Sequence, residues 1–172
     1  MLEIKPLTAA AFAPYGDVIE ISDRIQPMGI NYGYTERFHD LADIDTNAQG
    51  GRPGVSIFRS KPLPTPINIR IMERHPLSSQ AFIPISDEPY LVVVAPAGDL
   101  DESRIEVFRA QPGQGVNYAP GTWHHFCLAL NKSCNFVVID RIGKGHNCDE
   151  VELSQPQTIV LPTAQHTRVA TA

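Results

Sequence analysis

The chain has 172 residues, with 14 basic and 19 acidic side chains and a formal net charge of −5 at pH 7. This length suits one domain with a sizeable core. Phosphate binding needs concentrated positive charge, so the acidic balance and the lack of a Lys/Arg cluster argue against a nucleic-acid partner.

Membrane and secretory patterns are also missing from the sequence. No stretch approaches the ~18 apolar residues of a membrane span, and residues 1–10 lack the apolar region of a signal peptide. The cysteines Cys127, Cys134 and Cys148 include no CxxC pair, so they predict neither a disulfide framework nor a zinc knuckle. We therefore expect a cytoplasmic protein with no membrane partner.

The first predicted element is a short helix over residues 7–13, with Thr8 as its N-cap and Pro14 just beyond it. Runs rich in β-branched and aromatic residues follow, each of strand length and each ending in turn residues. Their sequences are YGDVIEI, GVSIFRS, INIRIMER, QAFIPI, YLVVVAP, RIEVFRA, GVNYAPG and NFVVIDR. No repeat or linker divides the chain. This spacing predicts a mainly β protein, built as a sandwich or a barrel.

The run INIRIMERH, residues 67–75, gives the first indication of a site. By strand alternation, one face carries Ile67, Ile69, Ile71, Glu73 and His75, and the other carries Asn68, Arg70, Met72 and Arg74. An apolar face that ends in Glu73 and His75 favours a closed barrel that is lined by aliphatic side chains and carries these two reactive residues at its opening. The alternative is a strand that simply emerges into solvent at Glu73.

A second indication comes from residues 115–131, GVNYAPGTWHHFCLALN. Pro120 and Gly121 predict a tight turn, after which Trp123 and the pair His124 and His125 lead into an apolar strand. Neighbouring strand residues face opposite sides, so we expect one histidine to point inward, and the pattern does not say which. A lone inward histidine is more often a hydrogen-bonded core residue, whereas convergence with Glu73 would favour a site.

These two segments resemble the two motifs of the cupin superfamily. Glu73-x-His75-x4-Gln80 is similar to the HxH-x3–4-Glu motif, with Glu in place of the first His and Gln in place of the Glu. Pro120-Gly121-x-x-His124-His125 is similar to PxGxxH, shortened by one residue before His124, so either histidine can be the matching position. The resemblance predicts a cupin-like jelly-roll β-barrel with a short N-terminal helix and few others. We expect one barrel domain over residues 1–153 and a C-terminal extension, residues 154–172, packed on the barrel or on a partner subunit.

Four segments in order resemble the ureidoglycolate lyase family: INYGYTERFHDL, ERHPLSSQAFIP, GVNYAPGTWHH and VVIDRIGKGHNCDE. Four separated motifs are far more specific than one. The resemblance covers residues 1–153 and implies a homodimeric enzyme of allantoin (purine nitrogen) degradation that cleaves (S)-ureidoglycolate into glyoxylate and urea. Two alternatives are a cupin that binds a small ligand without chemistry and a metal-dependent cupin oxygenase or isomerase.

This cleavage needs a base for the hydroxyl proton, an acid for the leaving nitrogen and a cation for the carboxylate. We expect acid and base among the catalytic residues Glu73, His75 and His124, without assigning which is which. Gln80 is suited to the ureido group, and the guanidinium choices are Arg37, Arg59, Arg70 and Arg74, of which the last two face outward. The expected substrate-binding residues are Asn31, Tyr32, Arg37, Arg59, Gln80 and His125.

The segment that carries Asn31, Tyr32 and Arg37 is by itself typical of a solvated loop. The resemblance implies instead a loop that closes over the substrate and supplies Arg37, with the second subunit as one source. His146, in a Gly-rich turn, is expected to be exposed.

Metal binding is the remaining expectation. Glu73, His75 and His124 are the types of ligand that a first-row divalent ion takes, and an α-hydroxy acid is a good bidentate partner. The two departures from the cupin motif lower the expected affinity. We therefore expect no tightly bound cofactor, or a weakly bound divalent metal, for which the resemblance makes Ni²⁺ a candidate.

Overall fold

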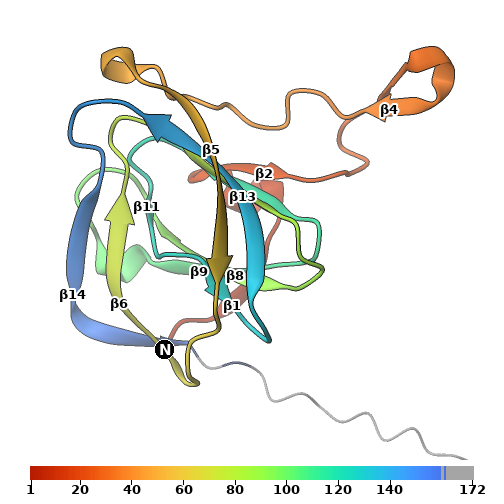
Figure 1. Ribbon diagram of the computed structural model, residues 1–172. Helices are drawn as coiled ribbons and strands as arrows, with labels where there is room; N and C mark the ends of the chain where they lie inside the picture. The colour runs from red at the N-terminus through yellow and green to blue at the C-terminus, as the bar shows by residue number, and fades with distance from the viewer. Residues whose placement is uncertain (160, 162–172) are drawn as a thin grey trace, which may run out of the picture.

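The computed structural model describes residues 1–159 and 161. Two β-sheets curl around a common core and form a barrel, from which one hairpin projects (Figure 1). Helix is limited, within the described residues, to α1 (Ala9–Phe12) and the single 3-10 turns η1 (Asn31–Gly33), η2 (Ala48–Gly50) and η3 (Glu102–Arg104). The predicted mainly β, cupin-like barrel with a short N-terminal helix is confirmed.

The larger sheet has seven strands in the order β1–β9–β8–β11–β6–β14, with β12 also paired to β8. Its strands are β1 (Ile4–Pro6), β6 (Ile67–Arg74), β8 (Tyr90–Ala95), β9 (Glu106–Ala110), β11 (Trp123–His124), β12 (Leu128–Ala129) and β14 (Asp149–Ile159). The smaller sheet has five strands in the order β2–β10–β7–β13–β5. They are β2 (Gly16–Ile19), β5 (Arg52–Ser60), β7 (Gln80–Pro84), β10 (Gly115–Tyr118) and β13 (Cys134–Ile142).

The helix α1 forms where the sequence predicts it. The Thr8 hydroxyl accepts a hydrogen bond from the Ala11 amide at 3.2 Å, which satisfies one of the free N–H groups of the first turn. Phe12 is completely buried at the end of the helix, and its ring meets the edge of Phe108 from β9. The helix therefore closes one side of the core.

The core divides at β8, whose sequence YLVVVA is buried at every position. One face of β8 enters the cluster that fills the barrel, through Tyr90, Val92 and Val94. The opposite face enters a second cluster, through Leu91, Val93 and Ala95. A continuous apolar run is the pattern of a strand covered on both faces.

Strict alternation fails along β6. Met72 was predicted to face outward, but it is completely buried in the same cluster as Ile67 and Ile69. The pairing of β6 with β14 is irregular at the same point, where the extra residues between Glu152 and Gln157 lie on β14, opposite Ile69 to Ile71. The alternation of buried and exposed side chains along β6 changes phase between Ile69 and Met72.

The strand β14 continues past the predicted end of the barrel domain at residue 153. Its last residues pair with the start of β6, and Ile159 is completely buried. Residues 154–159 are therefore part of the barrel, because they complete its sheet. The rest of the predicted extension lies outside the described residues, apart from Leu161, which packs against the second cluster.

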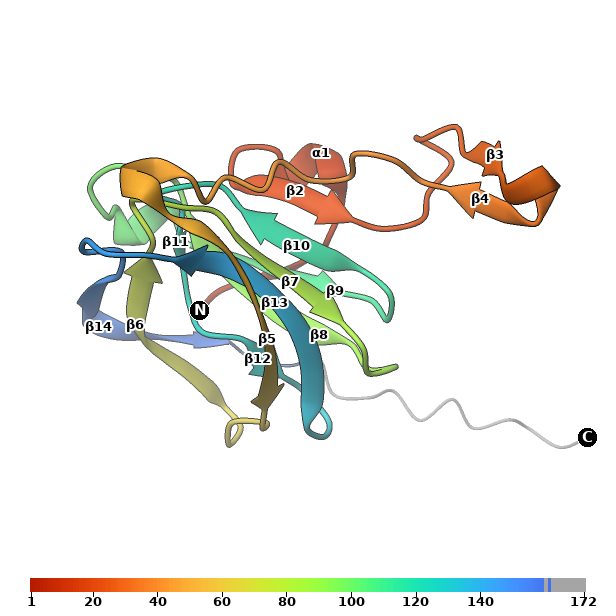
Figure 2. The ribbon, with the colours of Figure 1, turned by 45° about the horizontal axis from the view of Figure 1, so that its top comes forward.

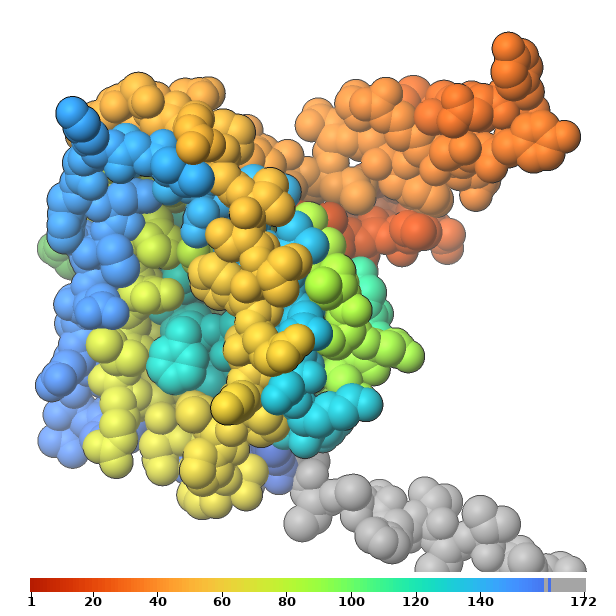
Figure 3. All heavy atoms as spheres, viewed as in Figure 1, coloured from red at the N-terminus to blue at the C-terminus, as the bar shows by residue number. Residues whose placement is uncertain are grey.

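The projecting hairpin consists of β3 (Met28–Ile30), η1 and β4 (Thr35–Arg37), and we call residues 28–37 the arm. The arm stands clear of the barrel in two views of the ribbon and in the space-filling view (Figures 2 and 3). Every residue of its two strands is exposed. No helix in the described part of the chain is long and apolar enough to cross a membrane.

Candidate functional site

The structure brings together the three residues predicted to be catalytic. In the sheet, His124 on β11 lies directly opposite Glu73 on β6, and His75 follows two residues later. His124 Nδ1 is 3.7 Å from Glu73 Oε1, and the rings of His75 and His124 are 5.2 Å apart. One ligand atom from each residue lies within 4.8 Å of the others. The predicted convergence of the two motif segments is therefore found.

The Pro-Gly turn holds these segments in place. Gly121 has φ 78°, a left-handed conformation that glycine adopts without steric cost, and its N–H donates to the His75 carbonyl at 2.9 Å. The side chain of Thr122 donates to the Tyr15 carbonyl at 3.0 Å. The chain thus enters β11 at a fixed distance from the end of β6.

His124 is a buried, neutral histidine. Its ring stacks on Tyr118 with the centroids 4.2 Å apart, and its side chain is 1% exposed. Burial, and next the nearby His75, lowers the pKa of His124 to about 3. Since Nδ1 faces the His125 carbonyl and the Glu73 carboxylate, we place the proton on Nδ1. Nε2 is then a buried lone pair without a hydrogen-bond partner in the described structure.

His75 presents a lone pair in the same way. Its Nδ1 lies 2.6 Å from the backbone carbonyl of Asn147, which can only accept, so Nδ1 carries the proton. Nε2 is buried and has no hydrogen-bond partner among the described residues. The side chain of Asn147 holds the following loop, because it accepts from the Leu77 amide at 2.7 Å and donates to the Ser78 hydroxyl at 2.9 Å.

Glu73 is a partly buried carboxylate between two neighbours in the sheet. It lies opposite His124 on one side and opposite Glu150 of β14 on the other. Burial raises the pKa of Glu73, the electrostatic interaction with His75 lowers it, and the nearby Glu150 carboxylate raises it further. A carboxyl group with a raised pKa is suited to proton transfer near neutral pH.

Gln80 completes the polar set at the start of β7. Its amide Nε2 donates to Asp140 Oδ2 at 3.3 Å, and its Oε1 is a buried acceptor without a partner in the described part of the chain. Gln80, His75 and Asp140 border a cavity of about 370 Å³, which Arg141, His146 and Cys148 also line. Glu73 borders a separate, smaller hollow of about 200 Å³ with Ile71, Phe126 and Glu150.

The other predicted substrate-binding residues lie away from this cluster. Asn31, Tyr32 and Arg37 are all on the exposed arm. Arg59 is on the edge strand β5, where its Nε donates to Asn135 Oδ1 at 2.8 Å. His125 is buried, and its Nδ1 donates to the Phe126 carbonyl at 2.9 Å. Of the two adjacent histidines, His124 is the one that meets Glu73.

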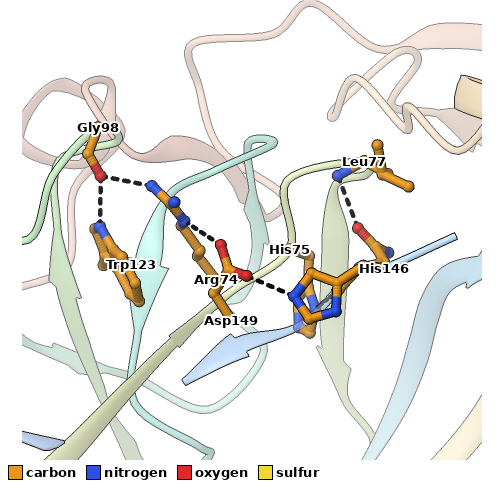
Figure 4. Close-up of polar contacts among 8 residues, drawn as sticks. Arg74, His75, Leu77, Gly98, Trp123, His146 and Asp149 are labelled. Atoms are coloured by element: carbon orange, nitrogen blue, oxygen red, sulfur yellow. Dashed lines mark hydrogen bonds and ion pairs between the residues drawn. The ribbon is translucent and has the colours of Figure 1, made fainter. Parts of the chain in front are cut away.

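Arg74 is covered, although alternation placed it on the outward face. Its guanidinium lies over the Trp123 ring at 4.6 Å and donates to the Gly98 carbonyl at 2.6 Å and to Asp149 Oδ2 at 2.8 Å (Figure 4). The other oxygen of Asp149 accepts from His146 Nε2 at 2.6 Å. His146 is 73% exposed, as predicted, but Asp149 holds its ring at the edge of the cavity.

The cavity wall formed by Asp140, Arg141 and residues 145–148 was not predicted from the sequence. These polar residues follow directly after the apolar run NFVVI, at the end of β13 and in the loop to β14. Chemistry-bearing residues just beyond a buried strand are a usable signal. Their contact with Gln80 depends on the pairing of β13 with β7, which brings together residues 60 positions apart.

Comparisons with known proteins identify the family of this chain. The sequence model of the family described as ureidoglycolate lyase matches residues 1–160. The ureidoglycolate lyase of Burkholderia mallei (strain NCTC 10229) is 54% identical over 154 residues, which is 90% of each chain. That of Pseudomonas syringae pv. syringae (strain B728a) is 49% identical over 161 residues, 93% of this chain and 94% of the relative. The chain therefore belongs to the ureidoglycolate lyase family.

Proposed function

We propose that this protein is a ureidoglycolate lyase, which cleaves (S)-ureidoglycolate into glyoxylate and urea. The family membership and the names of the relatives support this activity. The observation that carries it is the convergence of Glu73, His75 and His124, with unpartnered nitrogen lone pairs on both histidines. The site thus offers proton-transfer groups within a few ångströms of one another.

The reaction is an elimination that consumes no water. A base removes the hydroxyl proton from the α-carbon, the oxygen electrons form the carbonyl of glyoxylate, and the C–N bond breaks. The electrons of that bond go to the ureido nitrogen, which takes up one proton and leaves as urea. The enzyme therefore needs one group that accepts a proton and one that donates a proton on the same substrate.

His75 is the base in this proposal and Glu73 is the acid. The Asn147 carbonyl holds the Nδ1 proton of His75, so Nε2 is free to accept the hydroxyl proton. Burial raises the pKa of Glu73, so its protonated form persists closer to neutral pH and can supply the leaving nitrogen. His124 cannot be the acid, because a pKa of about 3 leaves it without the second proton. Its role is to position and shield Glu73.

The same residues fit a weakly bound divalent metal. One ring nitrogen from each of His75 and His124 and one carboxylate oxygen of Glu73 lie within 4.8 Å of one another, which suits an ion such as Ni²⁺. Such an ion would be held by Glu73, His75 and His124 and would supply Lewis-acid polarisation of the substrate hydroxyl. The acid and base roles given above apply to the metal-free site, because a nitrogen bound to the metal cannot accept a proton. Among the described residues this cluster offers three ligands, so we propose weak rather than tight binding.

We propose that the protein acts as a homodimer in which the arm of one copy packs on the other copy. The arm exposes Met28, Ile30 and Tyr34 without packing on its own barrel. The outer face of β5 exposes Val55 and Ile57, at 73% and 60%. Apolar patches of this kind commonly mark contact surfaces. This arrangement would also carry Asn31, Tyr32 and Arg37 to the neighbouring barrel.

Sedimentation velocity tests the dimer. The wild-type protein is expected to sediment as a dimer, and Ile57→Lys and Tyr34→Lys are each expected to shift it toward the monomer. Ile85→Lys, at an isoleucine that is 58% exposed after β7, is the control with the same change of charge. A monomeric wild-type protein contradicts the proposal. A place in allantoin degradation and a cytoplasmic location complete the proposal, and the free thiols of Cys127, Cys134 and Cys148 agree with a reducing compartment.

A further inference from the structure

The cavity beside His75 is lined by one guanidinium, that of Arg141 at the end of β13. Its Nε donates to the Ala48 carbonyl at 2.9 Å, and Nη2 donates to the Lys144 carbonyl at 2.7 Å. Backbone carbonyls fix the group without cancelling its charge. The ion pairs found among residues 1–159 do not include Arg141. The positive charge at this cavity is therefore positioned and left without an anionic partner.

Two glycines make room for this side chain. A methyl group at Gly51 would collide with Arg141 Nε, and one at Gly143 would lie 2.8 Å from Nη2. Gly51 has φ −70°, a backbone conformation that any residue adopts. Glycine is therefore needed here because a side chain would not fit, and not because of the backbone conformation. The backbone thus approaches the guanidinium closely on two sides, and the seat of Arg141 is built into two separate segments.

The rest of the cavity offers lone pairs. Gln80 donates its amide N–H to Asp140, so Oε1 is the atom left to meet a ligand. His75 likewise presents Nε2 as an acceptor. Hence the cavity lining offers one cation that suits a carboxylate and two acceptor atoms that suit N–H and O–H donors.

We infer that Arg141 binds the carboxylate of the substrate and determines specificity for an acid, while Gln80 Oε1 accepts a hydrogen bond from the ureido group. The inference rests on the proposed function, because ureidoglycolate carries a carboxylate at one end and ureido N–H groups at the other. Arg37 and Arg59, the residues expected from the sequence, do not line this cavity in the same chain.

Binding of two unreactive analogues tests the inference. Ureidoacetate lacks the hydroxyl and keeps both ends of the substrate, and ureidoacetamide has an uncharged amide in place of the carboxylate. By calorimetry, the wild-type protein is expected to bind the acid about 10- to 100-fold more tightly than the amide. Arg141→Gln is expected to bind both equally, and Arg141→Lys to keep part of the preference, since lysine lacks the planar fork.

Two further variants serve as controls for the effect of Arg141 on the acid preference. Gly143→Ala keeps the arginine but places a methyl group against its Nη2. This variant is expected to weaken the acid preference without abolishing folding. Arg109→Gln removes an exposed guanidinium on β9 and is expected to keep the full preference. A purely structural role for Arg141 would weaken binding of acid and amide alike.

The outcomes separate the inference from the proposed function. If Arg141→Gln still prefers the acid, or if the wild-type protein does not discriminate, the inference is wrong. If the wild-type protein prefers the acid and Arg141→Gln does not, but ureidoglycolate is not cleaved by the wild type, the carboxylate site stands and the lyase activity fails.

Discussion

The imidazole of His75 donates from Nδ1 to the backbone carbonyl of Asn147, 2.6 Å away. This contact joins the end of β6 to the loop before β14 and decides which nitrogen of His75 meets the substrate. Because a carbonyl cannot donate, the lone pair is on Nε2, where it is buried without a partner among the described residues. The tautomer of His75 is thus set by the fold.

Replacement of His75 by Gln removes the base. We expect the turnover number to fall by about 10²- to 10⁴-fold, the usual contribution of a positioned acid or base. The measurement is steady-state formation of glyoxylate, with His146→Gln as a control that changes an exposed histidine at the same cavity. An equal loss in both variants would show that the cavity edge, and not the lone pair of His75, limits the reaction.

Replacement of Glu73 by Gln is expected to abolish activity and, at pH 8, to increase stability. Because the folded pKa of Glu73 is raised, the neutral form favours folding, and this contribution is lost as pH rises through the folded pKa. In metal-free protein, Glu73→Gln is therefore expected to be inactive but more resistant to denaturant than the wild type at pH 8, with the difference disappearing at pH 4. Urea titrations at the two pH values measure it. A variant less stable at pH 8 would contradict the burial argument.

His124 predicts acid sensitivity with the opposite sign. Its folded pKa is lowered from 6.5 to about 3, so its contribution is complete above pH 6.5 and falls as pH drops toward 3. Wild-type, metal-free protein should lose about 1.4 kcal/mol per pH unit from this group below pH 6.5. In His124→Asn that slope is expected to be absent, as seen in denaturant unfolding between pH 7 and 4.5. Identical slopes in the two proteins would mean that His124 is not buried in its neutral form.

We also expect Glu73, His75 and His124 to bind a divalent metal. Titration of chelator-treated protein with Ni²⁺ is expected to give weak, saturable binding at one site per chain, and His124→Asn is expected to weaken it further. Calorimetry gives the stoichiometry and the affinity. Tight binding that survives His124→Asn would place the metal elsewhere.

Most of the features that position the site were predicted from the sequence, and the incorrect predictions have physical causes. The helix cap at Thr8 and the turn at Gly121 are local features, and the structure has both. Met72 was misplaced because the alternation of β6 changes phase between Ile69 and Met72, beside an irregular stretch of β14, a partner strand remote in sequence. The Arg141 seat escaped prediction because it depends on carbonyls and glycines from separate segments, which no local pattern joins.

The most direct test is a product assay with racemic ureidoglycolate, in which glyoxylate, urea and ammonia are followed separately in chelated and in Ni²⁺-supplemented protein. The proposal predicts glyoxylate and urea in equal amounts, from half of the racemate, and no ammonia. Release of ammonia, or no turnover in either preparation, would contradict it. Absence of turnover would favour the alternative that the protein is a cupin that binds a small ligand without chemistry.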